Sequence, residues 1–192
     1  MRSVRVVDLL VKGALVALLA SAVLFPDLSG IKGKASTARL VVYPLGVLAV
    51  PLWWWVHGRR RAVGSDRGGF PWWADLLVSL PWLLDLLGNR LDLFDTVSWW
   101  DDGMHFLNWA LLTAGVLLAW APRGLSRGVV VVCGLAFGMG SALLWELGEY
   151  VAFVRGSPEL ATAYTDTLGD LSLGSLGALL AGLVVSRLRR IP

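Results

Sequence analysis

The sequence predicts an all-α membrane protein, a polytopic bundle of about six transmembrane helices that forms one domain over residues 1–192. Of the 192 residues, 56% are hydrophobic and only 16% are charged, whereas soluble domains carry about 25% charged residues. The mean hydropathy is +0.67. Eleven tryptophans fit the same class, because indole rings favour the membrane–water interface. We therefore expect most of the chain to lie in lipid.

Six segments are long and apolar enough to be considered as spans, since a span needs about 20 mostly apolar residues. The first resembles a secretory signal, but its apolar run continues to Phe25, so we expect an uncleaved first span. The third is the least apolar, because it contains Asp75, Pro81 and Asp85. The expected spans are residues 6–25, 40–56, 71–87, 100–120, 129–154 and 166–187.

The positions of Lys and Arg predict the orientation, because cytoplasmic loops carry an excess of both. If the chain starts in the cytoplasm, eleven basic residues fall on the inner side and five on the outer side. Lys12 is left out as a side chain that reaches toward the interface, and Asp75 is expected to be interfacial. Both termini are thus expected in the cytoplasm, with the protein in the inner or plasma membrane and no nucleic acid as a partner. The inner residues are Arg2, Arg5, Arg59, Arg60, Arg61, Arg67, Arg123, Arg127, Arg187, Arg189 and Arg190, and the outer ones are Lys32, Lys34, Arg39, Arg90 and Arg155.

Polar residues interrupt the last three spans at one level of the bilayer. Each span contributes a pair spaced i,i+3 or i,i+4, and such pairs share one helix face. At 1.5 Å per residue, all of them lie within about 12 Å of the outer ends of their spans. The pairs are Asp101 with His105, Glu146 with Glu149, and Asp166 with Asp170.

Five carboxylates at one depth require compensation, because a charge at the centre of a membrane helix costs about 2.5–3.5 kcal/mol. The outer halves of these three spans contain no Lys or Arg, which leaves protons or divalent cations. Oxygen ligands with one imidazole suit Zn, Mn, Mg or Fe without choosing among them. We predict a divalent-metal site formed by Asp101, His105, Glu146, Glu149, Asp166 and Asp170, with Asp85, Asp102 and Asn108 as additional candidates.

Two interpretations without a metal remain open. Ser98-x-x-Asp101 and Thr167-x-x-Asp170 both fit a capping box, in which the acid satisfies backbone N–H groups at a helix start. Asp102 lies one step off the shared face and is expected to be solvated. Capping does not account for three residues inside the spans, which would then form a protonated, hydrogen-bonded core: His105, Glu146 and Glu149.

Small residues continue the acidic faces of the fifth and sixth spans. Their spacing lets membrane helices approach closely, so we expect these two spans to pack directly with their carboxylates toward each other. The residues are Ala142, Gly138 and Gly134 in the fifth span, and Gly174, Gly177 and Ala181 in the sixth.

Three spaced motifs carry a family resemblance: Trp-Asp101-x-x-x-His105-Phe, then Trp-Glu146-x-x-Glu149, then Thr-Asp166-x-x-x-Asp170 followed by Gly177-Ala178. Together they resemble the YjdF-like family of bacterial inner-membrane proteins, and more distantly the VanZ-like proteins linked to glycopeptide (teicoplanin) resistance. The resemblance covers about residues 70–187. It implies a polytopic membrane protein that shares these acids and this histidine, and it supplies no reaction. Asp102 departs from the family pattern.

Three functions are compatible with such a site. A metal-dependent hydrolase or transferase would act on a lipid or envelope precursor, with the ion activating a water and Glu149 as general base. A cation or proton transporter would also use intramembrane acids, although spans four to six offer no ionisable group further inward. A non-catalytic envelope protein would keep the metal as a structural element. The expected partners are membrane lipids and a lipid or envelope-precursor substrate, and the oligomeric state is left open.

Overall fold

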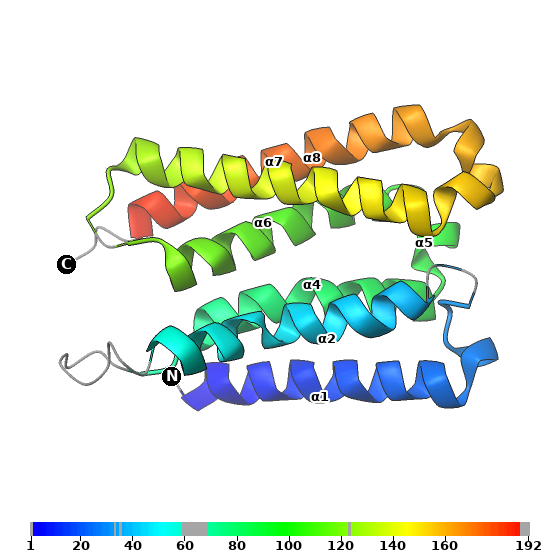
Figure 1. Cartoon of the computed structure of the whole chain (residues 1–192), viewed down its shortest axis with the longest axis horizontal. Helices are drawn as coiled ribbons and strands as arrows, with labels where there is room; N and C mark the ends of the chain where they lie inside the picture. The colour runs from blue at the N-terminus through cyan, green and yellow to red at the C-terminus, as the bar shows by residue number, and fades with distance from the viewer. Residues whose placement is uncertain (1, 33, 35, 59–68, 123, 189–192) are drawn as a thin grey trace.

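The computed structural model describes residues 2–32, 34, 36–58, 69–122 and 124–188, and within them every regular element is helical. Six long helices run alternately up and down one axis, so α1 begins and α8 ends at the same end of the bundle (Figure 1). The predicted all-α bundle is confirmed. The long helices are α1 (Arg2–Leu24), α2 (Ser36–Trp53), α4 (Trp72–Arg90), α6 (Trp100–Trp120), α7 (Arg127–Ala152) and α8 (Ala163–Leu188).

Local sequence explains several helix ends. Ser126 starts α7, because its side chain accepts a hydrogen bond from the backbone N–H of Val129 at 3.4 Å. In α2, a π-helical turn over Trp54–Gly58 follows Pro51, which cannot donate to the helix ladder. A short helix, α5 (Leu93–Thr96), bridges α4 and α6 at the end of the bundle where α6 begins.

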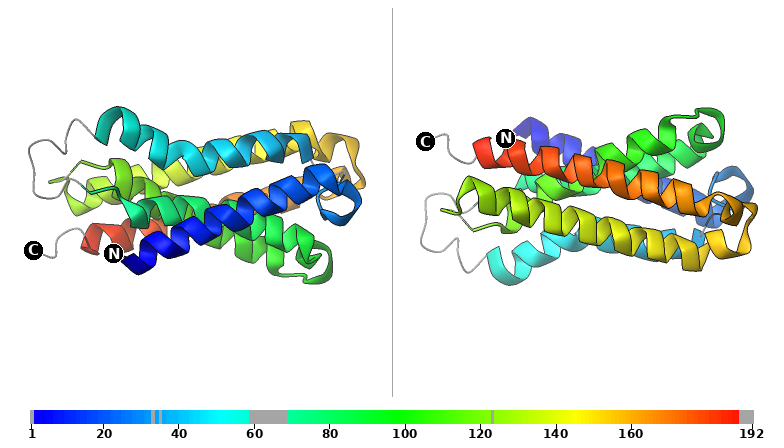
Figure 2. Two further views of the ribbon diagram at one scale, coloured as in Figure 1. Left: turned by 90° about the horizontal axis from the view of Figure 1, so that it is seen from below. Right: turned by 90° about the horizontal axis from the view of Figure 1, so that it is seen from above.

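Five of the six long helices are long and apolar enough to cross a membrane, and α4 is the exception. It corresponds to the third expected span and contains Asp75, Pro81 and Asp85. It packs against α1, α2 and α6 (Figure 2), and half of its length is buried. Its polar side chains therefore face other helices more than lipid, and for this reason α4 can be less apolar than the other five long helices.

The cytoplasmic location of both termini stays a prediction. The two outermost described ends lie on one side of the bundle, as an even number of crossings requires. Seven of the eleven residues assigned to the inner side lie outside the described residues: Arg59, Arg60, Arg61, Arg67, Arg123, Arg189 and Arg190.

Glycines set the packing of α8. A Cβ on Gly138 of α7 would lie 2.2 Å from the Cβ of Ala178, so α7 and α8 pack directly, as expected. Gly174 and Gly177, however, face α6 rather than α7. A Cβ on Gly177 would lie 2.1 Å from the backbone oxygen of Phe106. The small residues of α8 thus allow close packing against both α6 and α7. The contact of Gly177 with Phe106 on α6 lies beside His105.

A buried ion cluster joins α1 to α4, toward the end where α1 begins. The Lys12 ammonium contacts a carboxylate oxygen of Asp75 and lies 3.2 Å from Oδ2 of Asp8. Both aspartates are 0% exposed, and the Lys12 side chain is 20% exposed. The structure adds that α1 covers α4 and turns these charges toward each other, while the expectations that Lys12 reaches toward the interface and that Asp75 is interfacial stay predictions.

We expect Lys12→Met to destabilise the protein by about 3–5 kcal/mol, because it leaves two buried carboxylates without a cation. Thermal unfolding in detergent micelles measures the effect. Lys32→Met is the matched control, since Lys32 pairs with Asp27 in an exposed ion pair and should shift nothing measurable. A Lys12→Met protein as stable as this control would contradict the role of the buried cluster.

Gly177→Ala should cost about 1–3 kcal/mol, because the added methyl group meets the backbone of α6. Gly169→Ala in the same helix should be neutral or stabilising, since a Cβ there meets nothing within 4 Å. Unfolding of the two variants in the same micelles makes the comparison. Equal stability would show that α8 does not depend on this close approach.

Candidate functional site

The polar residues of the last three helices meet around one cavity of about 360 Å³ at the end of the bundle where α6 begins. All six predicted metal ligands line it, and so do Asp85 and Asn108. The cavity walls come from α2, α4, α6, α7 and α8, with Lys34 and Glu159 from the connecting segments. We call it the acidic cavity. Its residues lie far apart in the sequence, so the helix packing alone brings them together.

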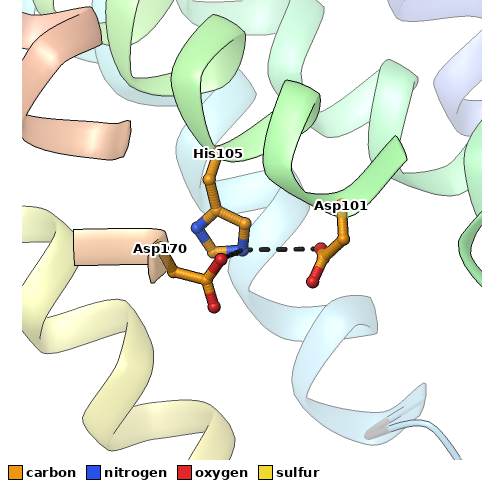
Figure 3. A group of neighbouring side chains, drawn as sticks. All are labelled: Asp101, His105 and Asp170. Atoms are coloured by element: carbon orange, nitrogen blue, oxygen red, sulfur yellow. Dashed lines mark ion pairs between the residues drawn. The ribbon is translucent and has the colours of Figure 1, made fainter. Parts of the chain in front are cut away.

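His105 occupies the centre of this group (Figure 3). Its Nε2 lies 3.5 Å from Oδ1 of Asp101 and 3.6 Å from Oδ1 of Asp170. Its Nδ1 lies 3.8 Å from Oε1 of Glu146. The His105 side chain is 12% exposed and that of Asp170 is 6% exposed, while Asp101 is more open at 44%. One imidazole from α6 thus faces carboxylates from three helices.

The spacing around His105 is too wide for hydrogen bonds, which join nitrogen and oxygen at about 2.7–3.2 Å. The buried Nδ1 of His105 and the buried Oδ1 of Asn108 both lack a hydrogen-bond partner in the structure. One ligand atom each from Asp101, His105 and Asp170 lies within 4.8 Å of the other two. Polar atoms therefore converge on a shared space without bonding one another.

Two glutamates from α7 extend the site. The Glu146 side chain is 10% exposed, and its Oε2 accepts a hydrogen bond from the Thr167 hydroxyl at 3.1 Å. Glu149 lies one turn further along α7 on the same face and also lines the cavity. Asp166 is exposed at the rim. Asp102 is exposed and is not part of the wall, in keeping with its position one step off the face.

The helix starts do not support the capping interpretation. The N-cap of α6 is Trp99, and no side chain caps that end. Helix α8 begins at Ala163, three residues earlier than its expected start, so Thr167 and Asp170 lie inside it. Thr167 donates its hydroxyl hydrogen to Glu146. The expected capping box at Thr167 and Asp170 is wrong, because the turn before Asp166 already continues the helix.

Sequence reasoning missed a basic contribution from α2. Arg39 donates from Nε to Oδ2 of Asp85 at 3.1 Å, and Tyr43 donates its hydroxyl hydrogen to the same oxygen. Arg39 was assigned to an outer loop, whereas it belongs to the first turn of α2. The i,i+4 spacing of Arg39 and Tyr43 was the available signal, because it places both on one helix face. Asp85 lines the cavity in this ion pair, and its role as an additional metal ligand stays a prediction.

A second basic residue sits at the cavity mouth, outside the spans. Lys34 pairs with Asp95 of α5, and this hydrogen bond lowers the pKa of Asp95 from its ordinary value. Burial raises the pKa of Glu159 in the segment before α8. The mouth therefore has one acid, Asp95, whose negative charge is paired with Lys34, and one acid, Glu159, whose burial disfavours the charged form.

The charges of the acidic cavity do not balance. Of its acids, Asp85 and Asp95 pair with Arg39 and Lys34. The others have no Lys or Arg within 4.0 Å among the described residues, and His105 is the single basic group at their centre. These unpaired acids are Asp101, Glu146, Glu149, Glu159, Asp166 and Asp170.

Comparison with known proteins identifies a family for this chain and does not indicate an activity. Residues 13–191 match the family described as "Predicted membrane protein (DUF2238)". No curated protein and no solved structure matches the chain. The more distant similarity to VanZ-like proteins stays a prediction. Because the match covers nearly the whole chain, in line with the resemblance to YjdF-like proteins, the chain belongs to this family of predicted membrane proteins.

Proposed function

We propose that the acidic cavity binds a divalent cation, held by Nε2 of His105 and by one carboxylate oxygen each of Asp101 and Asp170. The spacing of these atoms carries the proposal. Two atoms that each lie about 2.1 Å from a shared ion are about 3–3.5 Å apart. The 3.5 and 3.6 Å distances from Nε2 lie at or just above that separation and are too long for hydrogen bonds.

Glu146 and Asn108 complete this arrangement. Glu146 faces Nδ1 of His105 at 3.8 Å, so a small approach of the two side chains would let its carboxylate accept a hydrogen bond from Nδ1–H and leave Nε2 as the ligand atom. The Thr167 hydroxyl holds the other oxygen of Glu146 in place. The unpartnered Oδ1 of Asn108 offers a further oxygen. This ligand set suits Zn, Mn, Mg or Fe.

The charge imbalance supports the same proposal. Carboxylates at this depth repel one another, and their desolvation is costly. A divalent ion removes both costs at once, whereas His105 carries at most one positive charge. Protonation of several acids is the alternative, and the separation of 3.5–3.6 Å between Nε2 of His105 and two carboxylate oxygens favours the cation over direct hydrogen bonds.

The chemistry that we propose is hydrolysis or group transfer on a lipid or envelope precursor in the cell (inner) membrane. A bound divalent ion lowers the pKa of a water and polarises an ester or phosphoryl oxygen. Glu149 lies on the wall of the cavity one turn from Glu146, and in this proposal it acts as the general base. The position of the cavity at one end of the bundle suits an amphiphilic substrate.

Elemental analysis of the purified protein tests the metal. We expect a divalent metal in near-stoichiometric amount in the parent protein and only traces in His105→Gln and Asp170→Asn. Asp102→Asn is the matched control, because Asp102 belongs to the same helix as His105 and lies outside the cavity. Circular dichroism and unfolding confirm that each variant is folded. Equal metal content in all four proteins would remove the proposal.

A second candidate function is cation or proton transport, which one observation favours. The buried Asp8, Lys12 and Asp75 cluster supplies ionisable groups toward the other end of the bundle, where the sequence of spans four to six offers none. The buried hydroxyl of Ser79 lies one turn beyond Asp75 in the direction of the cavity and has no hydrogen-bond partner.

Reconstituted vesicles separate the two functions. For an enzyme, we expect the metal-loaded protein to cleave a phosphoester or carboxylic-ester lipid, and Glu149→Gln to retain metal but lose at least 100-fold in turnover, as loss of a general base predicts. Neither protein should move protons or divalent cations across the vesicle membrane. Flux that is lost in Asp75→Asn, without lipid cleavage, would establish the transporter instead.

A further inference from the structure

A second cavity lies next to the first. It has a volume of about 630 Å³ and is bounded by α2, α4, α6 and α7. Helix α2 packs on α4 and not closely on α7, so the space between α2 and α7 stays open. The lining is almost entirely apolar and includes Val42, Ala49, Val116, Phe137, Leu144 and Gly148. We call it the apolar groove.

The apolar groove adjoins the acidic cavity. The same seven residues line both: Arg39, Tyr43, Trp82, Trp109, Leu112, Trp145 and Glu149. The volume of the groove falls within the range of about 300–1,000 Å³ that is usual for small-molecule sites. A single molecule can therefore place one end among charged residues and the other among apolar ones.

We propose that the apolar groove holds one hydrocarbon chain of a membrane amphiphile whose anionic headgroup reaches the cation in the acidic cavity. The headgroup part rests on the proposed function, and the chain part does not. In a bilayer, hydrocarbon is the solvent that fills an apolar recess, because an empty recess forfeits the dispersion contacts of its walls. This groove differs from an ordinary lipid-facing surface in two ways. It is concave, and charged residues lie at the end that adjoins the acidic cavity.

The charge at the junction selects the headgroup. The acids alone repel an anion. A bound divalent ion changes this locally, because it can take an anionic oxygen as a further ligand. Arg39, although paired with Asp85, places its guanidinium at the border between the two cavities, with its side chain 11% exposed. An anionic headgroup is therefore expected to bind in a metal-dependent way, while the chain enters the groove whether or not the metal is present.

Two glycines of α7 provide a matched pair of variants. A Cβ on Gly148 and a Cβ on Gly140 both meet nothing within 4 Å, so a side chain added at either position starts into open space. Gly148 lines the apolar groove and Gly140 does not. Gly148→Leu therefore fills the groove, and Gly140→Leu adds the same side chain to the same helix elsewhere.

Photo-crosslinking in nanodiscs tests the proposal, with phosphatidic acid and phosphatidylcholine that carry a diazirine near the end of one chain. Mass spectrometry then locates the labelled residues. We expect the phosphatidic-acid label to concentrate on groove residues of α2 and α7, and to fall at least fivefold there in Gly148→Leu but not in Gly140→Leu. Chelation of divalent metal should lower labelling by phosphatidic acid more than labelling by phosphatidylcholine.

Labels spread evenly over the lipid-facing helix surfaces, or groove labelling unchanged in Gly148→Leu, would overturn the proposal and show ordinary bilayer contact only. Metal content of the same preparations keeps the two ideas separate. Stoichiometric metal with even labelling removes the groove and leaves the metal site. Groove labelling in a protein without metal removes the proposed function and leaves the chain site.

Discussion

The dominant constraint on this bundle is that every carboxylate placed among membrane helices needs a nearby positive charge. The chain meets it in three ways. Between α1 and α4, Lys12 faces two fully buried aspartates. Between α2 and α4, Arg39 holds Asp85. Between α6, α7 and α8, a group of acids surrounds one histidine. Each aspartate in the first two clusters has a Lys or Arg within 4.0 Å, whereas the acids of the third share a single histidine among the described residues.

The position of that third cluster depends on how closely α8 approaches α6. The glycine at position 177 brings the two backbones together beside Phe106, one residue after the histidine. The same approach sets the distance between Asp170 on α8 and the imidazole on α6. This packing therefore also sets the geometry of the site, and a shift of either helix would change the spacing of the polar atoms around His105.

The sequence predicts the helices well, because apolar length is a strong signal and polar residues within a span stand out against it. It also predicts that acids from three spans share one level, since rise per residue and topology are enough for that. The partners of Asp75 and Asp85 were not predictable in the same way. Lys12 lies 63 positions before Asp75, and Arg39 lies 46 positions before Asp85, so only the lateral order of the helices reveals these pairs.

The start of α8 illustrates another limit. Thr167 and Asp170 fit a capping pattern, and the pattern is local, but Ala163 and Tyr164 extend the helix past it. Capping residues compete with helix interiors by small free energies, about 1 kcal/mol, which tertiary contacts readily exceed. The hydrogen bond from Thr167 to Glu146 on the neighbouring helix is such a contact.

The enclosure of α4 has a consequence for how the protein is made. A segment with two acids and a proline inserts poorly into a bilayer on its own, since an unpaired charge within a membrane helix is costly. Its neighbours α1 and α2 leave the ribosome first and carry the counter-charges Lys12 and Arg39. Lys12 and Arg39 are therefore synthesised before Asp75 and Asp85, the acids of α4 that they neutralise. Helix α4 can then insert next to helices that already carry its counter-charges.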